Sequence, residues 1–129
     1  MKKLYKRTFL SILLVLSLLA AKAQALEDVT NGLRSGNIAM VAKYFDNTVA
    51  ITLSNNQSVY SKAQAEIVLR DFFIKNTVKD FTVRQGGPTS GGSKYAVGAL
   101  ETSAGIFQVY LVMKPKDDSY VLREIRFEK

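Results

Sequence analysis

Few side chains in this chain could carry catalysis, because its 129 residues include no histidine and no cysteine. Their absence excludes Ser-His-Asp and Cys-His nucleophilic sites, and every metal site built from imidazole or thiolate. Acid–base chemistry would therefore rest on Asp, Glu, Lys or Tyr. Asp46, at the predicted end of a helix, is the nearest candidate base, while Asp80 and Glu101 fall at predicted strand ends. A turn role is the favoured interpretation of all three, so we assign no catalytic residue, no metal ligand and no cofactor.

The aromatic residues are more informative about binding. A ring with one polar tip suits a ligand cavity as well as a protein interface. We expect a ligand-binding site formed by Tyr44, Tyr60, Phe73 and Tyr95. The alternative for each of these residues is ordinary packing in the core or on the sheet.

The N-terminal residues have the parts of a secretory signal peptide. Residues 2–7 include four basic side chains, residues 9–20 form an uncharged apolar run, and small-x-small cleavage patterns end at Ala23 and Ala25. A membrane-spanning helix needs about 20 apolar residues. We therefore expect export to the periplasm or the extracellular space, a mature chain beginning at Gln24 or Leu26, and no stable membrane insertion after cleavage.

Removal of residues 1–23 changes the charge of the chain. This segment holds five of the 18 basic residues and none of the 11 acidic ones, so the net charge falls from +7 to +2. Nucleic-acid binding needs a concentrated basic face, and we expect no nucleic-acid partner. Residues 24–129 are enough for a single domain with a core of its own.

Apolar residues at helical spacing predict three helices. The third is the longest and begins with a capping box, in which Ser61 and Gln64 satisfy each other's backbone amides. The predicted elements of this half are helices over Ala25–Arg34, from Asn37 to about Asp46-Asn47, and from Ser61 to about Lys75, with strands over residues 49–54 and 57–60 joined by a turn at Asn55-Asn56.

The second half of the chain predicts strands. Phe81 and Val83 mark one strand, and Gly86–Ser93 is expected to be a flexible loop. The last stretch predicts a β-meander of three antiparallel strands, over Lys94–Leu100, Ile106–Lys114 and Ser119–Phe127.

The alternation within these strands predicts their faces. If Leu100 pairs with Ile106, then Tyr95, Val97 and Ala99 face the helices together with Phe107, Val109, Leu111 and Met113. The opposite face then carries Ala96, Gly98, Leu100, Ile106, Gln108, Tyr110 and Val112, which is too apolar for water, and we expect it to form a homodimer.

The closing strand breaks the alternation. Tyr120 and Leu122 are out of phase with Ile125 and Phe127. One extra residue would bring all four to the same face, so the pattern predicts a β-bulge at Arg123-Glu124.

In element order the chain resembles the nuclear transport factor 2-like superfamily, an α+β cone of N-terminal helices packed on a curved antiparallel sheet. Three segments resemble corresponding segments of that superfamily: residues 42–49, where the second helix leads into the first strand, residues 61–66 at the start of the third helix, and residues 120–122 in the closing strand. More narrowly, the chain is similar to the exported bacterial family called domain of unknown function 4783. Enzymes of this fold place an Asp or His inside the cone, and no position here clearly matches. The resemblance therefore implies a fold rather than an activity.

These observations are consistent with two hypotheses about function, one a binding protein and the other an enzyme. The first is an exported, non-catalytic domain that binds a small apolar ligand or a partner protein. The alternative is a small cofactor-free enzyme of the isomerase or cyclase kind that uses an Asp base. The lack of histidine and of an obvious base favours the first.

Overall fold

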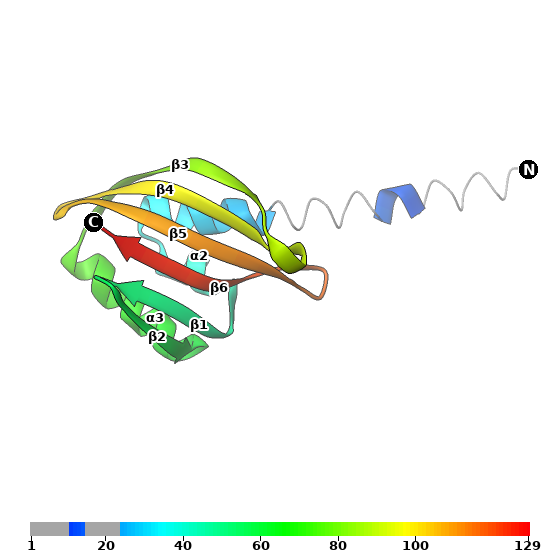
Figure 1. The fold of residues 1–129 in the computed structure, drawn as a ribbon, viewed down its shortest axis with the longest axis horizontal. Coiled ribbons are helices and arrows are strands. Elements are labelled where there is room, and N and C mark those ends of the chain that lie inside the picture. Colours follow the sequence, from blue (N-terminus) through cyan, green and yellow to red (C-terminus); the bar gives the residue numbers. More distant parts are fainter. Residues whose placement is uncertain (1–10, 15–23) are drawn as a thin grey trace, which may run out of the picture.

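The computed structural model describes residues 11–14 and 24–129 and places the main helices against a six-stranded curved sheet (Figure 1). Residues 11–14 form a helical turn, and the rest of the predicted signal peptide lies outside the described residues. From residue 24 onward the elements are a helix over residues 24–35, α2 (Ile38–Ala42), β1 (Phe45–Leu53), β2 (Asn56–Ser61), α3 (Lys62–Lys75), β3 (Val78–Pro88), the short 3₁₀-helix η1 (Ser90–Gly92), β4 (Lys94–Thr102), β5 (Gly105–Lys116) and β6 (Ser119–Glu128).

The strand order in the sheet is β2-β1-β6-β5-β4-β3. Every neighbouring pair is antiparallel except β1 and β6, which run parallel to each other. The predicted α+β fold is confirmed, with a mixed sheet in place of an entirely antiparallel one. β1 and β6 are far apart in the chain and no hairpin connects them, so no turn residue in the sequence predicts that they pair.

The core lies between the helices and the inner face of the sheet. Fully buried residues come from both layers, such as Leu69 from α3 and Leu111 from β5. Under the end of α3 the ring of Phe72 contacts those of Phe73, Phe107 and Phe127, at centroid distances of 5.4, 5.2 and 4.5 Å. Such pairs add roughly 0.5–1.5 kcal/mol each beyond their burial. They fix the C-terminal half of α3 to the sheet.

The sequence predicted the start of α3 correctly and the end of α2 incorrectly. Ser61 and Gln64 form the predicted capping box. The second helix, however, ends at Ala42 rather than near Asp46-Asn47, and Phe45 is the first residue of β1. Its apolar side chain continues the helical spacing of Ile38 and Val41, which is why the sequence pattern extends too far.

Two turns also differ from their predictions. The β1–β2 turn uses Ser54 and Asn55, with φ angles of 50° and 68°, rather than Asn55-Asn56. The expected flexible loop at residues 86–93 is largely ordered, because β3 pairs with β4 as far as Pro88 and η1 follows. Glycines in this segment fit a paired strand as well as a loop, since Gly86 and Gly87 lie opposite Ala96 and Tyr95.

The predicted register of the β4–β5 hairpin is wrong by one residue. Leu100 pairs with Phe107, and a two-residue turn at Ser103-Ala104 leads into Gly105, whose φ is +113°. A one-residue shift exchanges the two faces of a strand. Ala96, Gly98 and Leu100 therefore face the helices, while Tyr95, Val97 and Ala99 lie on the outer face of the sheet.

The predicted bulge in the closing strand is confirmed. Leu122 pairs with Met113 and Glu124 with Val112, so Arg123 is the extra residue. The bulge brings both halves of β6 into phase, and the four residues predicted to share a face are all buried. They are Tyr120, Leu122, Ile125 and Phe127.

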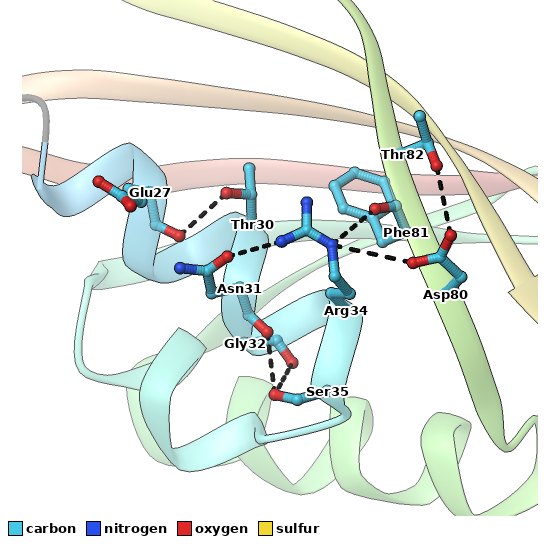
Figure 2. Close-up of polar contacts among 9 residues, drawn as sticks. All are labelled: Glu27, Thr30, Asn31, Gly32, Arg34, Ser35, Asp80, Phe81 and Thr82. Atoms are coloured by element: carbon cyan, nitrogen blue, oxygen red, sulfur yellow. Dashed lines mark hydrogen bonds and ion pairs between the residues drawn. The ribbon is translucent and has the colours of Figure 1, made fainter.

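Figure 2 shows how the first helix is fixed to β3. Arg34 Nε donates to the main-chain carbonyl of Phe81 at 3.0 Å and lies 3.8 Å from Asp80 Oδ1. The guanidinium also donates through Nη1 to Asn31 Oδ1 at 2.7 Å. Asp80 therefore has a structural partner at the edge of the sheet.

Candidate functional site

Two of the four predicted ligand-binding residues, Tyr44 and Tyr60, are half-buried against the core. Tyr44 follows α2 and donates a hydrogen bond to Asp28 of the first helix. This bond, together with burial, raises the pKa of Tyr44 to about 12. Tyr60 lies in the edge strand β2.

The other two lie on opposite faces of the sheet. Phe73 belongs to the core, where its ring contacts Phe72 and Phe127. Tyr95 lies on the outer face, where its ring centroid is 6.2 Å from that of Tyr110 and its hydroxyl accepts a hydrogen bond from Gln85. These four residues are not gathered around one cavity.

A cleft lies at the end of the sheet where β6 terminates. We call it the end cleft. Its volume is about 610 Å³, within the range of small-molecule sites. Its walls come from the β1–β2 turn, the C-terminal end of α3, the start of β5 and the end of β6. The lining residues are Leu53, Ser54, Asn55, Phe72, Asn76, Phe107, Glu128 and Lys129.

The end cleft combines an apolar floor with a polar rim. Phe72 and Phe107 are in edge-to-face contact and leave only 9% and 6% of their surfaces exposed. Asn76 terminates α3, and both its main-chain N–H and its side-chain Nδ2 donate to the Phe72 carbonyl, at 2.9 and 3.0 Å. That pair of bonds holds the amide in place at the rim.

Lys129 reaches back into the same cleft. Its Nζ donates to the main-chain carbonyl of Ala104 at 2.8 Å. The same atom lies 5.2 Å from the centroid of the Phe107 ring, which is a cation–π distance. The sequence analysis missed Lys129 because only the folded sheet brings the last residues beside the β4–β5 turn.

Asp46, the candidate base, lies at the opposite end of the sheet among cations. Its carboxylate is 2.7 Å from Lys114 Nζ and 3.0 Å from Lys116 Nζ, and Asp46 is only 7% exposed. The hydrogen bond from Lys114 is the largest of the effects that lower the pKa of Asp46 to about 2. A carboxylate held ionised by two ammonium groups is a weak proton acceptor at neutral pH.

The outer face of the sheet carries a second group of aromatic and apolar residues. The Arg126 guanidinium stacks 5.2 Å from the Tyr110 ring centroid and pairs with Glu124 at 2.6 Å. Around them Val59 and Ile106 are 68% and 61% exposed. A hollow of about 260 Å³ over β3, β4 and β5 includes Arg84 and Ile106 in its lining.

The described residues contain neither a metal-binding cluster of acidic side chains nor a membrane-spanning helix. No group of three or more Asp or Glu side chains within this part of the chain is placed to hold a metal ion. Within residues 11–14 and 24–129, no helix has the length and apolar content needed to cross a membrane.

A curved six-stranded sheet with helices packed against one face places this chain in the nuclear transport factor 2-like class of folds. Solved structures with little sequence identity share it. A putative isomerase from Bacillus subtilis is 10% identical, with a TM-score of 0.64, and the match covers 86% of this chain and 87% of that one. A de novo designed protein with a curved β-sheet is 9% identical, with a TM-score of 0.67, and the match covers 83% and 98%.

Within that class, the chain belongs to the family described as domain of unknown function (DUF4783), whose sequence pattern matches residues 26–128. A DUF4783 family protein from Bacteroides uniformis is 28% identical, with a TM-score of 0.76, and the match covers 80% of this chain and 94% of that one. Another from Bacteroides ovatus is 26% identical, with the same TM-score, and the match covers 79% and 92%. The search of curated proteins found no match.

Proposed function

We propose that this protein is an exported, non-catalytic binding domain that takes a small, largely apolar ligand into the end cleft. The observation that carries the proposal is the cleft itself, with its floor of Phe72 and Phe107 and its rim of Asn76 and Asn55. A ligand site of this kind combines apolar walls with a few polar groups that fix orientation. The proposed site keeps the aromatic character expected from the sequence but uses different residues.

Binding is favoured over catalysis by the state of Asp46. The alternative of an isomerase or cyclase requires a carboxylate that accepts a proton near neutral pH. Asp46 has its pKa lowered to about 2 and lies at the start of β1, whereas the cleft is lined by Leu53 at the other end of that strand. The likeness to a putative isomerase concerns the fold alone and supplies no base.

Native mass spectrometry of the protein purified from its host tests the proposal. We expect a bound species that adds mass to the folded protein and is lost on denaturation. Substituting Phe107→Ser should reduce its occupancy, whereas Thr82→Ser, on an exposed strand position away from the cleft, should not. Ligand-free protein from host cells, together with no binding in a screen of small apolar compounds, would overturn the proposal.

A second candidate is a homodimer formed through the outer face of the sheet. The specific observation is the row of half-buried or exposed apolar and aromatic residues that the register places there, including Tyr95, Val97, Ile106 and Tyr110. Exposed apolar patches on a sheet commonly mark protein interfaces. Sedimentation equilibrium at micromolar concentration distinguishes this dimer from a monomer.

Export through cleavage of the N-terminal segment completes the proposal. Ala25 lies in the first helix and is fully buried in the core. Cleavage after Ala23 would keep this core residue in the mature chain, whereas cleavage after Ala25 would remove it. We therefore favour Gln24 as the mature N-terminus, and an intact-mass measurement of the secreted protein that included residues 1–23 would contradict it.

A further inference from the structure

The Lys129 side chain already occupies part of the end cleft in the manner of a bound ammonium ion. Its Nζ has a carbonyl acceptor, Ala104 O at 2.8 Å, and an aromatic face, Phe107 at 5.2 Å. These are the two kinds of partner by which proteins recognise an alkylammonium group. Lys129 makes no ion pair with any carboxylate in the part of the chain that the structure describes.

Besides the Ser54 hydroxyl and the Asn55 amide, which can both donate and accept, the end cleft has acceptors and one negatively charged side chain. Glu128 lines the cleft and has no ion-pair partner within the described residues. Asn76 uses its Nδ2 on the Phe72 carbonyl, so that its Oδ1 remains as an acceptor. The fourteen-residue helix α3 ends here, and the last carbonyls of a helix carry a partial negative charge. The one positive charge in the lining is Lys129 itself.

We propose that the end cleft recognises a primary ammonium group attached to a short apolar or aromatic body, and that Lys129 is an internal occupant which such a ligand displaces. The inference rests on the proposed function and adds the charge and the shape of the ligand. The ammonium group takes the Ala104 carbonyl and the Phe107 face, and the apolar body covers Phe72.

The opposite role for Lys129, as a group that attracts an anionic ligand, makes the opposite prediction. Removing the Lys129 ammonium would then weaken the binding of a carboxylate. If Lys129 is instead a competitor, its removal strengthens the binding of an ammonium. A cation–π contact at an exposed site corresponds to about a two- to fivefold change in affinity.

The test uses three probes of similar shape: 2-phenylethylammonium, 2-phenylethanol and 3-phenylpropionate. Calorimetry gives the affinities, and amide chemical shifts of Asn76 and Phe107 give the location. We expect the ammonium probe to bind most tightly, Lys129→Met to strengthen it about two- to fivefold, and Glu128→Gln to weaken it. Lys62→Met, at the exposed start of α3, is the matched control and should change nothing.

Two outcomes overturn the inference in different ways. If the alcohol or the carboxylate binds in the cleft as tightly as the ammonium, or if Lys129→Met weakens the ammonium, the recognition of an ammonium is wrong while the ligand cleft stands. If no probe shifts Asn76 or Phe107, and host-purified protein carries no ligand either, both the inference and the proposed function are wrong.

Discussion

The Asp46 carboxylate is clamped by the Lys114 ammonium, which lies 2.7 Å away across the intervening strand β6. Lys116 contacts the other carboxylate oxygen at 3.0 Å, and both lysine side chains remain about one-third exposed. The contact ties the start of β1 to the end of β5, two strands that are not neighbours in the sheet. Asp46 therefore acts as a structural link between strands, whereas the sequence favoured a turn role and offered a catalytic base only as the alternative.

This clamp predicts a loss of stability in acid. The folded-state pKa of Asp46, about 2, lies below its ordinary value of 3.8. The contribution of the ionised Asp46 carboxylate to the free energy of unfolding is therefore complete above pH 4, and it is lost as the pH falls from 4 towards 2. Asp46→Asn should lower the free energy of unfolding at pH 7 by about 1–2 kcal/mol, allowing for screening around the exposed lysines. The difference from the unchanged protein should shrink towards zero near pH 2 in urea titrations.

Asp71→Asn is the matched control for the clamp. Asp71 also pairs with a lysine, Lys75 at 3.1 Å, but both side chains are well exposed on α3. Its removal should change stability by less than about 0.5 kcal/mol at any pH. Equal effects of the two substitutions would show that burial of Asp46 adds nothing to its ion pairs.

Features set by nearby residues could be predicted from the sequence. The capping box depends only on Ser61 and Gln64, and the bulge on the phase of four side chains in one strand. The register of the β4–β5 hairpin could not be predicted in this way. Thr102 pairs with Gly105, so the two strands continue beyond Leu100, where the sequence pattern ended the first of them. Its Oγ1 donates to the Gly105 carbonyl and accepts from the Ala104 amide, which closes a two-residue turn.

The end cleft could not be predicted, since its walls come from segments far apart in the chain. Phe72 comes from α3 and Lys129 from the end of the chain, 57 positions later in the sequence. Only the curvature of the sheet and the position of α3 bring them to the same end. The one-residue register error also placed Tyr95 on the wrong face of the sheet, away from Phe73 of the core.

Gly98 provides a test of how tightly the inner face of the sheet is packed. A Cβ at this position would lie 2.6 Å from two atoms of the Phe81 ring and 2.7 Å from the Thr82 carbonyl oxygen. Phe81 is itself 1% exposed and has little room to move. Gly98→Ala should therefore lower the free energy of unfolding by roughly 1–3 kcal/mol, measured by urea unfolding.

Gly87→Ala is the control for this clash, because it changes the same residue type in the neighbouring strand. The nearest atom to its added Cβ is a Tyr95 ring carbon at 3.7 Å, an ordinary contact. Alanine also restricts the unfolded chain more than glycine does, so stability should be unchanged or slightly higher. A loss at Gly87 as large as that at Gly98 would argue against the packing explanation.

Tyr44 should deprotonate at unusually high pH. Its hydrogen bond to Asp28 is the main cause that raises its pKa from 10.0 to about 12. The protonated Tyr44 hydroxyl therefore stabilises the folded protein fully below pH 10, and this stabilisation is lost as the pH rises from 10 to 12. Carbon-13 NMR of the tyrosine rings should show one late titration, which Asp28→Asn shifts to lower pH and Tyr44→Phe removes. A late titration that survives Tyr44→Phe would contradict the assignment.

The outer face of the sheet gives the last prediction, which concerns assembly. Tyr110 lies near the middle of that face, flanked by Tyr95 at 6.2 Å and by Arg126 at 5.2 Å. In a two-fold dimer each copy presents the same patch, so a charge placed there meets its own copy. Tyr110→Glu should convert the proposed dimer to a monomer in sedimentation experiments at micromolar concentration. Ala63→Glu, which adds the same charge on an exposed position of α3, should leave the dimer intact. A protein that sediments as a monomer before any substitution would rule the dimer out.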